Sequence, residues 1–464
     1  MEKLPKEILI EILKSLPFSD LKRARLVCQR FLDAGSERKL WKNFILYISR
    51  GNLSKLDQIA ELKIMQDLKR VIFTGCAIKN EHVKILFRKN IKYLQLGSNH
   101  DVENDCDITN ISPKILANLM TNLEVFKFHN SLMSEMSEKQ SIAILKQLNK
   151  KSSISTLEIL YNNHLCSIAP EPLASALTSV TELTLVFQKL NADKYDAIFY
   201  HIYKKSNLKV VNLPGNNLSK VNPDLFGSAI SKLESSNLCD TNISIEMINN
   251  LFSKISRSKG PVKIQKIDLS HNCHLKHVPP QLFSECVSKL SSINLKQTCL
   301  QETQLSSLME LVVSRTSESC LSEVNLSTVS SLNKVDPELL ASFISRLTQA
   351  TLYATKLSTM QLSNIFMKLI NENHGLILLD IGGSNLSSVP HHLISSCIQT
   401  IENVNLYFTK LTTNQQIEIL QSLSCSKLSK FKLKYLDIGG NQGNIPENIL
   451  ENAEMKIGTV KLMT

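Results

Sequence analysis

NVNLYFTKL at residues 403–411 and LLDIGGSNL at residues 378–386 are two copies of one motif. In both copies, apolar residues alternate with other residues, a small polar residue follows, and a leucine closes the motif. The alternation predicts a short strand with one buried face. The closing leucine, Leu386 or Leu411, can therefore serve as a marker for further copies.

Markers of this kind recur along the chain in two interleaved series. A second-series marker is followed by a first-series marker after 25 residues, as from Leu386 to Leu411. Repetition at a fixed interval indicates an array of about 14 repeats over residues 52–464, each with a strand and a helix. The first series is Ile78, Met133, Leu190, Ile243, Leu300, Leu357 and Leu411. The second series is Ile108, Leu165, Leu218, Leu275, Leu332 and Leu386, with Gly443 in place of the next member.

Two further positions support this register. A proline follows several second-series markers, as in Leu218-x-x-Val221-x-Pro223, and predicts the start of a helix. The position two residues before each marker is small and polar or a cysteine, with Gln188 as the exception, and such side chains can satisfy backbone groups at a sharp turn. The residues at this position are Cys76, Cys106, Ser131, Asn163, Gln188, Asn216, Thr241, Cys273, Thr298, Ser330, Thr355, Ser384, Thr409 and Asn441.

The first 48 residues carry a different pattern, which predicts three short amphipathic helices. Pro5 stands at the start of the first helix and Pro17 at its end, and the third helix is expected over residues 40–48. A unit this small buries too little apolar surface to be comfortably stable by itself. Leu26 and Val27 also lie off the apolar face of the second helix, so we expect a partner protein to cover them.

Both parts of the chain resemble known families. Residues 1–48 resemble an F-box, with Phe31 where a tryptophan is common, and residues 52–464 resemble a leucine-rich-repeat horseshoe of the ribonuclease-inhibitor type. The resemblance implies an α/β fold, in which a leucine-rich-repeat solenoid with a parallel concave sheet and convex helices follows a three-helix F-box. The F-box pattern is carried by Leu4-Pro5, Ile8-Leu9, Ile12-Leu13, Leu16-Pro17, Asp20-Leu21, Val27-Cys28, Arg30-Phe31 and Leu40-Trp41.

The resemblance also implies a function. An F-box docks onto the Skp-type adaptor of a cullin-RING (SCF) ubiquitin ligase, so we expect a non-catalytic substrate receptor that works with this adaptor and the cullin scaffold and binds an unknown protein substrate. Such a receptor would act in the cytoplasm, the nucleus or both. The expected adaptor-binding residues are Leu4, Pro5, Ile8, Leu9, Ile12, Leu13, Leu16, Pro17, Leu21, Val27, Cys28 and Phe31.

Other readings of the same residues remain open. The N-terminal helices could be a structural cap on a stand-alone repeat scaffold or on an inhibitor-like binding module with no ligase role. A GTPase-activating horseshoe would need a catalytic Asn or Arg at its rim, and no residue is marked out for that role. Co-expression with a Skp-type adaptor separates the ligase receptor from the scaffold.

Composition narrows the remaining classes of function. The formal net charge is +11, but the basic residues are scattered and have no aromatic residues interleaved, which argues against a nucleic-acid interface. No apolar run approaches the length that spans a bilayer, and Glu2, Lys3 and Glu7 interrupt any signal peptide, so we expect no membrane partner. The 11 cysteines are an odd number, and several stand at the small polar position, which favours a reducing compartment.

Two residue clusters resemble metal sites only in part. His271, His274 and His277 recur every three residues, but no second ligand cluster follows them at a fixed spacing. The alternating acids between residues 101 and 107 resemble the start of a calcium loop, but Cys106 stands where that loop needs glycine. We therefore expect no metal, no other cofactor and no catalytic centre, and we interpret the acidic stretch as an insertion that forms a projecting loop.

Substrate binding is expected on the concave side of the strands. The alternation of strand residues places one set toward the core and the other toward the concave face. Aromatic and basic members of the concave set are the strongest candidates, because rigid amphipathic rings dominate interface energies: Lys127, His129, Tyr161, Lys296, Tyr353 and Tyr407. The rest of the set, in which Asn and Asp could instead serve turn hydrogen bonds, is Ile72, Ile159, Asn212, Asp268, Asn294, Asn325, Asp380, Asn405 and Asp437.

Overall fold

Parallel strands that follow one another in sequence order form the framework of the protein. The computed structural model describes residues 4–16, 18–37, 40, 44–56, 58, 68–97, 105–129, 136–150, 153–161, 163–315, 320–426, 431–441 and 443–462. The chain divides into two compact units, Met1–Asn212 and Leu213–Thr464. Pro17, Met133, Ser131 and most of the acidic insertion lie outside the described residues, so the expectations for them stay predictions.

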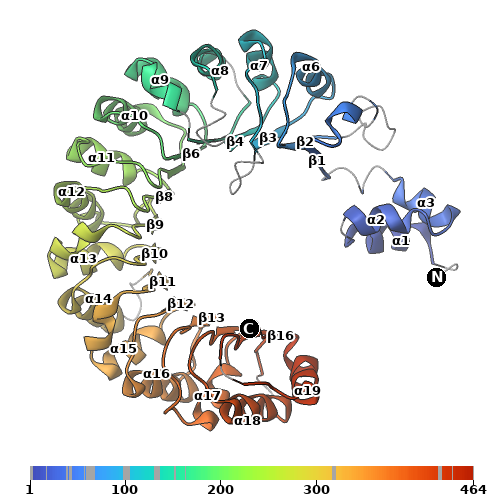
Figure 1. The fold of residues 1–464 in the computed structure, drawn as a ribbon. Helices are drawn as coiled ribbons and strands as arrows, with labels where there is room; N and C mark the ends of the chain where they lie inside the picture. The colour runs from blue at the N-terminus through green and yellow to red at the C-terminus, as the bar shows by residue number, and fades with distance from the viewer. Residues whose placement is uncertain are drawn as a thin grey trace. The chain divides into compact units, whose positions relative to one another are not determined.

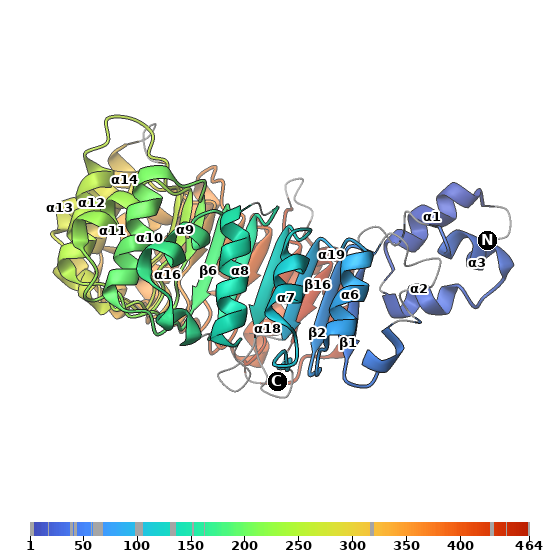
Figure 2. The same ribbon diagram turned by 90° about the horizontal axis from the view of Figure 1, so that it is seen from above.

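The first unit contains the N-terminal helices and the first strands. Strands β1 to β7 pair in parallel, each with the next, and Figures 1 and 2 show helices α6, α7 and α8 side by side over one face of them. The elements are α1 (Lys6–Lys14), α2 (Phe18–Ala24), α3 (Gln29–Gly35), β1 (Ile45–Ser49), η1 (Leu53–Lys55), β2 (Arg70–Thr74), α6 (Asn80–Arg88), β3 (Tyr93–Gly97), α7 (Pro113–Met120), β4 (Val125–His129), α8 (Glu138–Lys150), β5 (Thr156–Leu160), η4 (Asn163–Ser167), α9 (Pro170–Leu177), β6 (Glu182–Val186), α10 (Ala192–Lys205) and β7 (Val210–Asn212).

The second unit continues the same strand–helix alternation. Strands β8 to β16 also pair in parallel and in order, with the helices along their outer side (Figure 1). The elements are α11 (Pro223–Ile230), β8 (Ser235–Asn237), α12 (Ile245–Ser256), β9 (Lys266–Asp268), η5 (Cys273–His277), α13 (Pro280–Val287), β10 (Ser292–Asn294), α14 (Glu302–Ser314), β11 (Glu323–Asn325), η6 (Ser330–Lys334), α15 (Pro337–Ile344), β12 (Gln349–Thr351), α16 (Thr359–Asn371), β13 (Leu378–Asp380), α17 (His391–Ile398), β14 (Asn403–Asn405), α18 (Thr413–Ser424), β15 (Tyr435–Asp437), α19 (Glu447–Ile457) and β16 (Thr459–Lys461).

The architecture confirms the α/β assignment and is consistent with a solenoid. Every described marker with an apolar side chain is buried, including Leu218, Leu332 and Leu411 at 0% exposure. Short helices that begin with a proline, such as α11 at Pro223, alternate with longer ones such as α12. Among the described residues, no helix is long and apolar enough to cross a membrane.

A glutamine in the first turn of several long helices ties one repeat to the previous one. Gln361 of α16 is buried, and its Nε2 donates to the carbonyl oxygens of Leu332 and Val335 at 3.0 and 2.8 Å. Gln140 and Gln304 make the equivalent pair of bonds in α8 and α14. These side chains satisfy carbonyl groups at the turn into the preceding short helix. The sequence pattern did not reveal them.

The residues at the small polar position form a buried column, here called the polar column. At most of the described repeats the buried residue is the one that the sequence predicts. The hydroxyl groups of Thr241, Thr298, Thr355 and Thr409 each donate to a leucine carbonyl three residues earlier, at 2.6 to 2.8 Å. Among the members whose burial the structure describes, the expected residue is wrong at two repeats. Asn272 and Val329 occupy the buried position, whereas their neighbours Cys273 and Ser330 are exposed, because each of these turns contains one extra residue before its marker.

The N-terminal region differs from the prediction in two ways. The sequence predicts one second helix between a start at Asp20 and a break at Gly35, but the backbone is extended at Cys28, so α2 and α3 replace this longer helix. The third helix was expected over residues 40–48, but residues 45–49 form β1, which pairs in parallel with β2. The strand array therefore begins at Ile45, before the expected boundary at residue 52.

Candidate functional site

An ion cluster lies on the strands of the first unit. Lys127 Nζ is 2.8 Å from one carboxylate oxygen of Glu158, and His129 Nε2 is 2.9 Å from the other. Burial alone would raise the pKa of Glu158, but the contacts with His129 and Lys127 outweigh it and lower that pKa to about 2. Four members of the expected concave set are buried: Ile72, His129, Ile159 and Asp437. Ile159 points into the core, so Glu158 is the residue of β5 that faces the concave side.

We predict that Glu158→Gln lowers the free energy of unfolding by about 2 kcal/mol at pH 7. The pKa of Glu158 in the folded protein lies below the ordinary glutamate value of 4.5, so the stabilisation is present above pH 4.5 and is lost as the pH falls toward about 2. Urea unfolding at pH 7 and pH 3 measures this, and the variant should show the smaller loss between the two. Glu124→Gln is the matched control, because its pair with Lys92 is exposed and should contribute less than about 1 kcal/mol.

The turn after each of two neighbouring strands presents an aromatic ring. Tyr161 and Phe187 stack with ring centroids 5.2 Å apart and planes 7° from parallel. Both residues have positive φ angles, 53° and 50°, which are uncommon for aromatic residues. Phe187 remains 45% exposed. The backbone therefore holds a partly exposed aromatic platform at the turn edge of the first unit.

In the second unit, the Asn and Asp residues that end the strands close their own turns. The side-chain oxygen of Asp380 accepts a hydrogen bond from Gly382 N at 2.9 Å, and equivalent bonds of 2.8 to 3.1 Å recur at the other members. This row, here called the turn column, therefore has a structural role that the interpretation as turn hydrogen bonds anticipated. Its members are Asn237, Asp268, Asn294, Asn325, Asp380, Asn405 and Asp437.

Two residues beyond the strand ends, three repeats of the second unit carry a large side chain that takes no part in closing the turn. Lys296 is exposed, and Tyr353 and Tyr407 are half-buried at equivalent positions of two repeats. Gly382 occupies the same position in the repeat between them, and a Cβ atom there would lie 2.9 Å from the Tyr353 ring. The Phe408 ring packs edge-on against Tyr407, with centroids 4.5 Å apart, and a Cβ atom added at Gly440 would lie 2.8 Å from it. Aromatic residues and glycines thus alternate between neighbouring repeats, and the glycines make room for the rings.

The N-terminal helices α1, α2 and α3 pack on one another around a small core (Figure 1). Leu9 and Leu13 of α1 are each only 1% exposed, and Leu21 is 6% exposed. The Arg30 guanidinium donates to the Leu4 carbonyl oxygen, which holds the start of α1 against α3. These burials correct the expectation that Leu9, Leu13 and Leu21 present their side chains to a partner, since the chain itself already covers them.

Other apolar residues of the same helices are left uncovered. Ile8 and Ile12 lie one turn apart on α1 and are 46% and 45% exposed. Leu26 and Val27, in the turn that follows α2, are 82% and 69% exposed. The remaining expected residues are Leu4, Leu16 and Phe31, which are half-buried, and Pro5 and Cys28, which are exposed. A helical unit with this much exposed aliphatic surface has the composition of a docking surface.

A family model described as F-box-like matches residues 1–47. The N-terminal segment is an F-box-like domain. A search of curated proteins finds no match to the chain. The match ends inside β1, so the F-box-like domain and the strand array meet at this strand.

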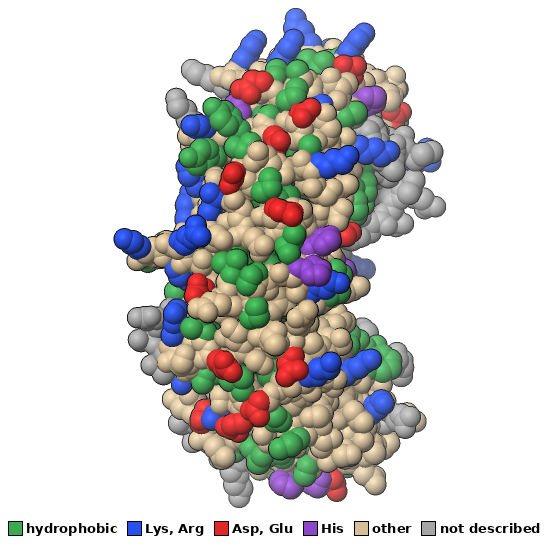
Figure 3. Space-filling view, turned by 90° about the vertical axis from the view of Figure 1, so that its left-hand side faces the viewer, with side chains coloured by type: hydrophobic (Ala, Val, Ile, Leu, Met, Phe, Trp, Pro, Cys, Tyr) green, Lys and Arg blue, Asp and Glu red, His purple; other side chains and the backbone are tan. Residues whose placement is uncertain are grey.

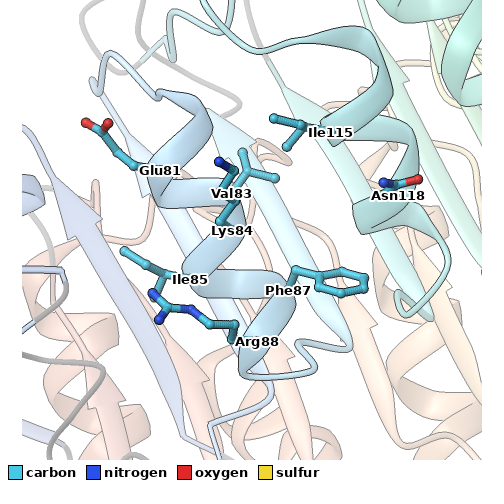
Figure 4. Close-up of a pocket in the computed structure, with 8 residues that line it drawn as sticks. All are labelled: Glu81, Val83, Lys84, Ile85, Phe87, Arg88, Ile115 and Asn118. Atoms are coloured by element: carbon cyan, nitrogen blue, oxygen red, sulfur yellow. The ribbon is translucent and has the colours of Figure 1, made fainter.

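Beyond the F-box-like domain, the outer helices carry a depression of about 580 Å³ beside α6 and α7 (Figure 4). Its apolar lining includes Phe87, whose ring points toward α7, and Ile115. The described lining holds charged residues such as Glu81 and Lys84 but no Ser, Cys or His that could pair with a base as a nucleophile. Its composition is that of a contact surface.

The strand array also carries candidate metal ligands and surface charges. Within the described part of the chain, no group of three or more His, Cys, Asp or Glu residues could hold a metal ion, and the histidines at 271, 274 and 277 form no such group. The outer face shown in Figure 3 carries basic and acidic side chains interspersed among its described atoms. Interspersed charges are typical of a solvated helical surface.

Proposed function

We propose that this protein is the substrate-recognition subunit of an SCF-type ubiquitin ligase. The observation that carries the proposal is the exposed aliphatic surface of the F-box-like domain, made of Ile8, Ile12, Leu26 and Val27. F-box domains bind Skp-type adaptors, and through that adaptor the chain would reach the cullin scaffold. The protein then does no chemistry of its own. It raises the local concentration of a bound substrate beside the ligase core.

The solenoid would supply the substrate site, with repeats of the ribonuclease-inhibitor leucine-rich type. Long and short helices alternate from repeat to repeat, which supports this type. Tyr353, Tyr407 and Lys296 are the best contact residues, because their side chains take no part in closing the turns. Their neighbours in the turn column are already committed to hydrogen bonds. Action in the cytoplasm, the nucleus or both follows from the ligase role.

Co-expression with a Skp-type adaptor tests the ligase role directly. The proposal expects the two chains to elute together in size-exclusion chromatography, with apolar surface on the F-box-like domain protected in the complex. Separate elution of a folded chain and the adaptor would favour the alternative, a stand-alone repeat scaffold or inhibitor-like module whose N-terminal helices act as a cap.

We predict that replacing both Tyr353 and Tyr407 with Ala weakens substrate capture by about 2 kcal/mol, or roughly thirtyfold. Two half-buried rings would lose their contact with the substrate, while the turns keep their Asn and Asp hydrogen bonds. Quantitative co-purification from cells measures the captured proteins, with adaptor binding as the internal reference. Met360→Ala, an exposed apolar residue on α16, is the matched control. Unchanged capture in the double variant would show that recognition lies elsewhere.

A further inference from the structure

Two exposed cysteines from neighbouring repeats meet at the turn edge of the second unit. Cys273 is the first residue of η5, after β9, and Cys299 lies in the connection between β10 and α14. The Cys299 thiol donates a hydrogen bond to the Cys273 sulfur, with the two sulfur atoms 2.9 Å apart. Because β9 and β10 pair directly, with Ile267 beside Ile293, the repeat stacking itself holds the two side chains together.

The extra residue in this turn creates the pair. Asn272 takes the buried place in the polar column, and this pushes Cys273 out to the surface beside Cys299. Two other cysteines differ sharply: Cys286 and Cys397 are fully buried, and burial raises the pKa of both thiols far above its ordinary range. Buried thiols of that kind are inert, whereas paired exposed thiols can be reached by a soluble reagent.

We propose that Cys273 and Cys299 form a dithiol modification site that takes a small disulfide such as glutathione disulfide. One protein thiolate attacks a sulfur of glutathione disulfide, the disulfide bond breaks, and one glutathione leaves with the electron pair. The second protein thiol then loses its proton and attacks the mixed disulfide, which releases the second glutathione. The two cysteines are oxidised to one protein disulfide, and glutathione disulfide is reduced to two glutathione thiols, which carry the two protons.

A positive charge beside the two cysteines favours the binding of glutathione disulfide. Lys276 is exposed in the same short helix as Cys273, and its positive charge acts on Cys299. Glutathione disulfide carries carboxylates, so the positive charge of Lys276 favours its approach. The Cys299 thiol donates its hydrogen bond to the Cys273 sulfur, and a donated hydrogen bond stabilises a thiolate at the acceptor, so Cys273 is the first nucleophile. This inference is independent of the ligase role.

The test treats the full-length protein with glutathione disulfide and maps its thiols by mass spectrometry without reduction. The expected product is a Cys273–Cys299 disulfide without bound glutathione, formed at a rate independent of protein concentration. Cys299→Ser should stop at the first step and keep one glutathione on Cys273. Cys166→Ser is the matched control, because it removes an exposed cysteine from the first unit and should leave the product unchanged.

Two results would overturn the proposal. One is a wild-type protein in which Cys273 and Cys299 each retain glutathione or remain free after treatment. The other is a Cys299→Ser variant that gains no more glutathione on Cys273 than the wild type gains at Cys166. Circular dichroism of each variant verifies that the thiols are compared in folded protein.

Discussion

Adaptor capture should disappear when Ile12 and Leu26 are both replaced by Asp, while the strand array stays folded. Both side chains lie on the exposed surface of the F-box-like domain, and each buried aliphatic residue in an interface is worth about 1.5 to 3 kcal/mol. A carboxylate placed in the same apolar contact must also be desolvated without a partner. Together these costs exceed about 3 kcal/mol, more than a hundredfold in affinity.

The measurement is co-purification of the adaptor, with circular dichroism and thermal unfolding as the folding readouts. Met455→Asp, which puts the same charge on an 80% exposed residue of α19, is the matched control and should bind the adaptor normally. Leu9 and Leu13 are unsuitable targets, since their replacement would open the core of the domain. Full adaptor binding by the double variant would contradict the assigned surface. Loss of the array's circular dichroism signal would instead show that the helices are a structural cap.

Replacing Asn272 with Ala should be among the most destabilising polar substitutions in the second unit, by about 4 kcal/mol. The Asn272 amide is buried and donates to the carbonyl oxygens of Leu238, Leu269 and Ser270 at 2.7, 3.2 and 3.1 Å. One of these bonds reaches Leu238 in the previous repeat, so the substitution removes hydrogen bonds both inside the turn and across an interface between repeats, although the Thr241 hydroxyl still donates to the Leu238 carbonyl oxygen.

Cys273→Ala, next in the chain, is the control. Under reducing conditions its exposed side chain should change the free energy of unfolding by less than about 0.5 kcal/mol. Urea unfolding of the two variants decides which residue belongs to the polar column. Equal destabilisation by both would contradict the placement of Asn272, and a larger effect of Cys273→Ala would restore the register expected from the sequence alone.

The sequence predicted the repeat array well because the burial of an apolar marker at a regular interval is a strong constraint, which the described apolar markers satisfy. Leu386 and Leu411 are fully buried, as their spacing required. The same spacing could not locate a single inserted residue, so Cys273 was placed one position away from the buried Asn272. Counting two residues back from each marker assumes that all the turns have the same length. The longer turn at Asn272 is revealed only by the hydrogen bonds of the folded protein.

Residues with two possible environments were harder to assign. Ile45 and Ile48 fit an apolar helix face, but they form a strand, because pairing with β2 outweighs the local pattern. On α1, Ile8 and Leu9 both belong to one broad apolar stripe, and periodicity alone does not say which edge faces inward. Glu158 was missed for a related reason, since a one-residue shift in a strand exchanges its two faces.

The turn column constrains how this protein could have diversified. The last residue of each strand is Asn or Asp in most repeats of the second unit, and its side chain accepts a hydrogen bond that closes the turn. The first residue of each strand does not close a turn, and its identity varies widely. From β8 to β15 these residues are Ser235, Lys266, Ser292, Glu323, Gln349, Leu378, Asn403 and Tyr435. Repeats that descend from one ancestral repeat could therefore acquire new ligands by substitution at the first strand position alone, while the hydrogen bonds that close the turns stay in place.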